Sequence, residues 1–119
     1  FGRPRIEINA EGSGTVEFAY GETLNLTYLD RFDFGKGTLC FGPVQDRFFR
    51  FLSLSWNIKK PLQVHTAKVL KRSYPVQYIG SFSCDDDLLN RAWQLGVETA
   101  YLNMYDHFVD CPYREHGLY

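Results

Sequence analysis

The chain has 119 residues, which is enough for one hydrophobic core and too short for two full-sized domains. Its 13 Lys and Arg residues and 14 Asp and Glu residues give a net charge of -1, and the basic residues are scattered apart from the run KVLKR at 68–72. This charge distribution argues against nucleic acid or an anionic membrane as a partner, and no apolar run approaches the roughly 20 residues of a membrane-spanning helix.

The N-terminal part of the chain predicts three half-buried strands. Apolar and polar residues alternate in RIEINA (5–10), TVEFAY (15–20) and TLNLTYL (23–29). A period of two is expected of a strand that buries one face, and the turn residues EGSG and GE separate the three runs. We therefore expect these strands to pair in chain order as a meander.

The middle of the chain predicts further strands of unequal strength. DRFDFGKGT (30–38) is expected to form a Gly-containing loop, and LCFGPVQ (39–45) a weak strand. RFFRFLSLSW (47–56) has the strongest β propensity, and LQVHTAKVLKRSY (62–74) predicts one or two more strands. Short strands with turns at this spacing predict a mainly β fold, an antiparallel, jelly-roll-like β-sandwich over residues 1–80.

The hydrophobic period then changes to that of a helix, and we predict one long helix over residues 85–109. Ser83, with Asp86 three residues later, is typical of a capping box, and Pro112 excludes helical angles just before it. One broad apolar face is formed by Leu88, Leu89, Ala92, Trp93, Leu95, Val97, Ala100, Tyr101 and Met104.

The predicted helix is too long and too apolar to lie alone against a small sandwich. At about 1.5 Å per residue it would measure about 37 Å. We therefore interpret residues 81–119 as the beginning of an all-helical domain. In that case Trp93, Tyr101 and Met104 cannot all be buried, and an apolar patch is expected on the surface.

The aromatic content and the cysteine spacing limit the fold classes and the kinds of site that the chain can form. Aromatic residues make up 17% of the chain, which suits either a sheet-rich core or a surface on which sugar rings stack. Cys40, Cys84 and Cys111 are odd in number and far apart in the sequence. They predict free thiols rather than a disulfide framework or a paired zinc site.

The string DCPYRE (110–115) carries a family resemblance. It follows the predicted helix, whose start lies in GSFSCDDDLLNRAW (80–93). This order resembles the junction in bacterial α-L-rhamnosidases of glycoside hydrolase family 78, where a jelly-roll β-sandwich leads into an (α/α)6 barrel. GTVEFAYGE (14–22) and RFFRFLSL (47–54) are similar to strands of the same family. The resemblance covers nearly the whole chain, and DCPYRE is its specific part.

The resemblance implies that the chain is a fragment of a larger glycosidase. Residues 1–80 would be the β-sandwich domain, and residues 81–119 the first helix and active-site loop of a truncated (α/α)6 catalytic domain. The parent would hydrolyse a terminal deoxyhexose or related glycoside with inversion, without a cofactor, in the cytoplasm or periplasm of a bacterium. The fragment would need the remainder of the parent enzyme as its partner and would be inactive by itself.

The family motif also implies roles for individual residues. Glu115 corresponds to the general acid, and Asp110 and Arg114 correspond to residues that hold sugar hydroxyls. Because an arginine neighbour lowers the pKa of a carboxyl group, the acid requires burial to stay protonated. Tyr119 stands near the position where the family has a tryptophan that lines the rhamnose pocket. Many members carry the acid one residue later, where this chain has His116.

Two other readings remain open from the residues alone. The sandwich could be a non-catalytic carbohydrate-binding or structural module, in which case a binding module would expose coplanar aromatic side chains on one sheet face and a scaffold would bury them. His107, Asp110, Cys111 and His116 could ligate a metal in principle. We expect no metal there, because the family motif already accounts for the aspartate and the cysteine.

Overall fold

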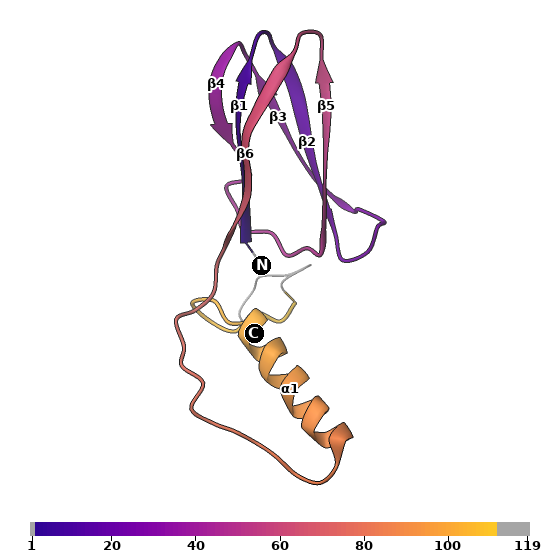
Figure 1. Ribbon diagram of the computed structural model, residues 1–119, viewed down its shortest axis with the longest axis vertical. Helices are drawn as coiled ribbons and strands as arrows, with labels where there is room; N and C mark the ends of the chain where they lie inside the picture. Colours follow the sequence, from indigo (N-terminus) through magenta and orange to yellow (C-terminus); the bar gives the residue numbers. More distant parts are fainter. Residues whose placement is uncertain (1, 112–119) are drawn as a thin grey trace. The chain divides into compact units, whose positions relative to one another are not determined.

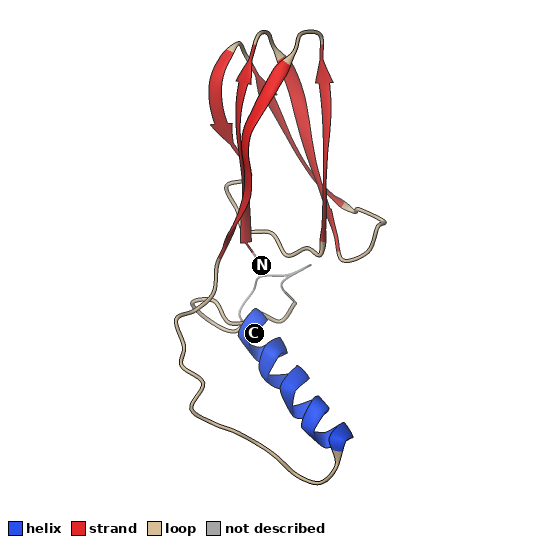
Figure 2. Ribbon diagram, viewed as in Figure 1, coloured by secondary structure: helices blue, strands red, loops and turns tan. Residues whose placement is uncertain are grey.

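The structure is a computed structural model that describes residues 2–111. The chain divides into two compact units, Phe1–Arg72 and Ser73–Tyr119. The first contains six β-strands and the second one α-helix (Figures 1 and 2). The elements in chain order are β1 (Gly2–Ala10), β2 (Gly14–Gly21), β3 (Tyr28–Phe34), β4 (Gly37–Phe41), β5 (Phe51–Ile58), β6 (Leu62–Lys71) and α1 (Asp87–Leu102).

The strands form two antiparallel three-stranded sheets, which confirms the predicted mainly β fold with a C-terminal helix. One sheet has the order β4-β1-β6 and the other β3-β2-β5. Figure 2 shows the two sheets as the layers of a β-sandwich. The meander prediction was wrong, because β1 pairs with β4 and β6 rather than with β2.

The central strand of each sheet supplies most of the core. Ile6 and Ile8 of β1 and Val16 and Phe18 of β2 are at most 2% exposed, and in each strand the buried residues alternate with more exposed ones. Alternate side chains of a strand point to opposite faces, so both central strands turn their apolar faces inward. Phe41 of β4 joins the layers, because its ring lies 6.3 Å from that of Phe18 in the other sheet.

The third strand differs from the prediction. Residues 23–27 form a loop in which Leu24 is 80% exposed, and the segment 30–38 that was expected to be a loop contains most of β3 and the start of β4. The alternation FDF within β3 places Phe32 and Phe34 inward, and this burial outweighs the alternation of leucines upstream. Gly37, with φ 127, occupies the left-handed region as the chain passes from β3 to β4 in the other sheet.

The helix is shorter at both ends than predicted. Asp86, rather than Ser83, is the N-cap, and its carboxylate accepts hydrogen bonds from the backbone amides of Leu88 and Leu89 at 2.8 and 3.3 Å. The helix ends at Leu102 instead of continuing to position 109. Asn103 caps its C-terminus, and its side-chain amide donates to the Thr99 carbonyl at 2.7 Å.

An extended segment, residues 73–86, precedes the helix and packs against it through side-chain contacts. Tyr78 packs on Tyr101 with ring centroids 5.8 Å apart, and Phe82 stacks on Trp93 at 6.3 Å. The Asn90 amide exchanges two hydrogen bonds with the backbone of Cys84, at 2.9 and 2.8 Å. The segment has no regular secondary structure of its own.

The apolar face of α1 remains accessible, as the sequence predicted. None of its residues is buried. Trp93 is 37% exposed and Tyr101 is half-buried. Met104, which lies just after the end of α1, is also half-buried. The exposed large apolar side chains of α1 are Leu88, Leu89, Trp93, Leu95 and Leu102. In the part of the chain that the structure describes, no helix is long and apolar enough to cross a membrane.

Candidate functional site

The predicted site begins just beyond the helix. Asp110 is exposed and follows Val109, which is 7% exposed. Cys111 is half-buried. Arg114, Glu115 and Tyr119, together with the alternative acid His116, lie outside the described residues, so their predicted roles stay predictions.

A tight turn positions Asp110. The backbone amide of Val109 donates to the Asn103 carbonyl at 2.9 Å, and that of Tyr105 donates to the His107 carbonyl at 3.0 Å. A β-bridge between Met104 and Phe108 lies between these two bonds. The chain thus reverses within residues 103–109, and this reversal is the reason why the helix cannot reach position 109.

The 103–109 turn carries an acid and an imidazole side by side. Nδ1 of His107 lies 2.6 Å from Oδ1 of Asp106. The Asp106 side chain is 73% exposed and that of His107 is 30% exposed. The carboxylate orients the imidazole ring and remains accessible from solvent, so it can accept a further hydrogen bond from a ligand hydroxyl.

A cavity of about 260 Å³ opens beside this pair. All of its lining residues belong to the second unit, and five of the six lie on the turn. They are Tyr74, Met104, Tyr105, Asp106, His107 and Phe108. Among these, sequence reasoning gave a possible role in a site only to His107, as a metal ligand. The available signal was the run MYDHF, which places aromatic rings on both sides of an acid and a histidine.

Metal-ligating and thiol groups form no further centre in the described range. Within residues 2–111 no group of three or more His, Cys, Asp or Glu side chains is placed to hold a metal ion. Cys40, Cys84 and Cys111 are free, as predicted. Cys40 is exposed on β4, and Cys84 is half-buried just before α1.

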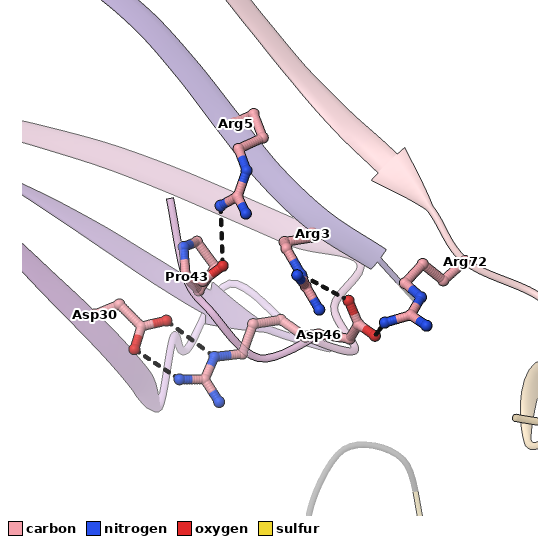
Figure 3. Close-up of polar contacts among 7 residues, drawn as sticks. Arg3, Arg5, Asp30, Pro43, Asp46 and Arg72 are labelled. Carbon is pink, nitrogen blue, oxygen red and sulfur yellow. Dashed lines mark hydrogen bonds and ion pairs between the residues drawn. The ribbon is translucent and has the colours of Figure 1, made fainter. Parts of the chain in front are cut away.

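The sandwich contains a separate polar cluster that sequence reasoning missed. Asp46 is 7% exposed and accepts hydrogen bonds from Arg3 at 3.0 Å and Arg72 at 2.8 Å (Figure 3). Arg5 donates to the Pro43 carbonyl at 3.0 Å. These contacts connect the loop before β5 to the first residues of β1 and to the chain just after β6.

A second ion pair lies close to a buried tyrosine. Arg47 donates two hydrogen bonds to Asp30, at 2.9 and 2.6 Å, and these bonds raise the pKa of the Arg47 guanidinium. The guanidinium carbon lies 5.8 Å from the ring centroid of Tyr20. Burial, and secondly the charge of Asp30, raises the pKa of the Tyr20 phenol well above its ordinary value. The Tyr20 hydroxyl oxygen is buried and has no hydrogen-bond partner within the described structure.

Comparison with known families gives one match. A family model described as the bacterial alpha-L-rhamnosidase 6 hairpin glycosidase domain matches residues 77–119. The matched range contains α1, the 103–109 turn and the DCPYRE string, and it includes none of the strands β1 to β6. No curated protein and no solved structure gave a match. The match supports a rhamnosidase-like family and a glycoside-hydrolase-like origin for this part of the chain.

Proposed function

We propose that the chain is part of an inverting glycosidase that removes a terminal deoxyhexose or a related sugar. Residues 1–80 are its β-sandwich domain, and residues 81–119 are the first helix and active-site loop of its (α/α)6 catalytic domain. The observation that carries this proposal is the family match over residues 77–119. The match includes the four residues to which this proposal gives a catalytic or substrate-binding role, Asp110, Arg114, Glu115 and Tyr119.

The proposed mechanism divides the work between two carboxyl groups. Inversion requires an acid that protonates the leaving oxygen and a carboxylate, about 6.5 to 9.5 Å away, that activates water. Glu115 supplies the acid, Asp110 and Arg114 hold sugar hydroxyls, and Tyr119 stacks on the ring. The catalytic base comes from another part of the parent protein, so we expect the 119-residue chain to be inactive by itself.

The described residues at the start of the proposed site are compatible with these roles. Asp110 is exposed, whereas its neighbour Val109 is buried and hydrogen-bonded to Asn103. A buried anchor directly before an exposed carboxylate limits where that carboxylate can move. The exposed apolar face of α1 also supports the proposal, because a helix of a multi-helix domain packs such a face against neighbouring helices.

The competing function, a carbohydrate-binding sandwich module, is less well supported. Among the described aromatic residues of the first unit, residues 2–72, only Tyr28 is exposed, at 38%. Phe18, Tyr20 and Phe34 are buried, and Phe32, Phe41, Phe49 and Trp56 pack partly buried against the same core. Sugar stacking on a sheet face requires several exposed, coplanar rings, so this distribution favours a scaffold.

The deciding experiment is Glu115→Gln in the complete parent protein, with His116→Asn as the matched control. Glutamine keeps the shape of glutamate but has no acidic proton. We expect hydrolysis of an alkyl glycoside, whose leaving group needs protonation, to fall by about 10²- to 10⁴-fold. Hydrolysis of an aryl glycoside with an acidic leaving group should fall much less.

The control separates the two candidate acids. If His116→Asn produces the selective loss and Glu115→Gln does not, the acid lies one residue later than proposed. Wild-type rates for Glu115→Gln on both substrates would exclude Glu115 as the general acid.

A further inference from the structure

We propose that the cavity on the 103–109 turn is a binding site for a single pyranose ring. The choice of a sugar rests on the proposed glycosidase function, but the site itself is defined by described residues of the second unit. None of its lining residues belongs to the set to which a catalytic or substrate-binding role was assigned above. The site is therefore additional to the DCPYRE loop.

The size of the cavity limits the ligand. Its volume of about 260 Å³ lies just below the range of roughly 300 to 1,000 Å³ that is usual for drug-sized ligands. One six-membered ring fits this volume, and a longer oligosaccharide could occupy it with only one unit. The site is accordingly suited to one sugar residue of a larger glycoside.

The lining has the mixture of surfaces that a sugar ring needs. The two faces of a pyranose carry C–H groups and pack against aromatic rings, whereas its edge carries hydroxyl groups. Tyr74 is 47% exposed and Phe108 is 59% exposed, so both rings are accessible for stacking. Asp106 provides a carboxylate for a charge-assisted hydrogen bond from a sugar hydroxyl.

Local structure holds these groups in place before a ligand arrives. Phe108 and Met104 are joined by the β-bridge of the turn. The backbone amide of Val76 donates to the Tyr74 carbonyl at 2.9 Å, which fixes the chain next to Tyr74. A preformed site loses less conformational entropy on binding. The Asp106 carboxylate contacts His107 through one oxygen and is 73% exposed, so it can accept a further hydrogen bond from a hydroxyl group, which a polyhydroxylated ring supplies and an apolar ligand does not.

The experiment measures binding without catalysis. The 119-residue chain is titrated with methyl α-L-rhamnopyranoside, and amide shifts of isotopically labelled protein are followed by NMR. Cyclohexanol serves as the apolar probe of similar size. We expect a dissociation constant on the order of 1 to 10 mM for the glycoside, as is usual for a small ligand on an open site, and shifts that concentrate at residues 104–108.

Three variants and one control test the location. Phe108→Ala and Tyr74→Ala each remove one stacking ring and should weaken binding by about 2- to 10-fold. Asp106→Asn keeps the shape of the carboxylate, removes its charge, and should weaken binding by about 3- to 10-fold. Tyr28→Ala removes an exposed ring from β3 and should leave binding unchanged. Far-UV circular dichroism checks that each variant keeps α1.

Each outcome decides the proposal separately from the proposed function. Absence of binding to methyl α-L-rhamnopyranoside and to the corresponding glucoside and galactoside would overturn the sugar site. Cyclohexanol binding as tightly as the glycosides would also overturn it, as would unchanged binding in Phe108→Ala and Tyr74→Ala. Hydrolysis by the parent protein and its loss in Glu115→Gln are measured independently, so the catalytic assignment can fail while this site stands, and the reverse also holds.

Discussion

The two units of the chain are stabilised in different ways. In the sandwich, the central strands bury Ile6, Ile8, Val16 and Phe18 almost completely. In the second unit, no residue of α1 is buried, and the helix is held by its caps and by two aromatic pairs with the preceding segment. The comparison indicates that the sandwich depends on its interior, whereas the helix depends on local contacts near its own backbone.

The largest expected effect tests this difference with matched truncations. Ile8→Ala should lower the free energy of unfolding of the sandwich by about 2 to 5 kcal/mol, because Ile8 is fully buried. Leu88→Ala should change stability by less than about 0.5 kcal/mol, because Leu88 is 73% exposed. Urea titration measures both effects: Trp56 fluorescence in a Trp93→Phe background reports the sandwich for Ile8→Ala, and far-UV circular dichroism reports α1 for Leu88→Ala. Equal losses in the two variants would mean that α1 is covered in solution, and the comparison would fail.

The second prediction asks whether polar contacts also matter inside the sandwich. Asp46→Ala removes the carboxylate shared by Arg3 and Arg72 and should lower the free energy of unfolding by about 1 to 3 kcal/mol. The expected loss of stability is smaller than for a fully buried ion pair, because the Arg72 side chain is 45% exposed and its charge is partly screened by solvent. Asp33→Ala, at an exposed position of β3, is the control and should be nearly neutral. A neutral Asp46→Ala would show that the sandwich relies on its apolar core alone.

The third prediction examines the local contacts of the helix. Asp86→Ala removes the N-cap and should lower helix stability by about 1 kcal/mol, within a range of about 0.5 to 2 kcal/mol. Asp85→Ala removes a neighbouring charge but no cap and should have a smaller effect. Thermal melts followed by far-UV circular dichroism measure the helical signal. The idea of a locally stabilised helix would be refuted by identical melts for Asp86→Ala and the unmodified chain.

The smallest effect is expected at the buried Tyr20 hydroxyl. Tyr20→Phe should raise stability at neutral pH slightly, by up to about 1 kcal/mol, because it removes a buried hydroxyl that has no hydrogen-bond partner among the described residues. The pKa of Tyr20 is raised in the folded state, so at alkaline pH the unfolded chain releases a proton that the native state keeps. Stability should therefore fall above the ordinary tyrosine pKa of about 10, and Tyr20→Phe should lack this share of the fall. A variant with the same alkaline profile as the wild type would contradict the raised pKa.

The sequence predicted the strands that bury one face and missed the partners of those strands. Alternation located the strand at 15–20, which is confirmed within β2, because alternation reflects burial directly. It failed at 23–27, where Leu24 is 80% exposed in a loop, and it overlooked Phe32 and Phe34, whose run is short and lies next to glycines. Pairing could not be predicted, because β1 finds its neighbours β4 and β6 far along the chain.

The candidate site was predictable only in part for a different reason. The string DCPYRE could be found because its residue types are specific and contiguous. The cavity could not, because Tyr74 is brought to the turn by the path of residues 73–86, which has no periodic signal. The early end of the helix was also missed, since the backbone hydrogen bonds that reverse the chain within residues 103–109 leave no trace in the hydrophobic pattern.

The pairing of β1 with β6 sets the order in which the sandwich can form. Gly2 lies opposite Lys71, so the sheet that contains β1 is complete only when the last strand of the unit is available. Pairing of β2 with β3 closes only a short loop, with Tyr20 opposite Tyr28. It therefore loses less conformational entropy than the pairings of β1. During synthesis on the ribosome, the β2–β3 hairpin can therefore form before β4 and β6 are available to pair with β1. Such a high contact order makes the sandwich the slow-folding part of the chain and the α1 helix the fast one.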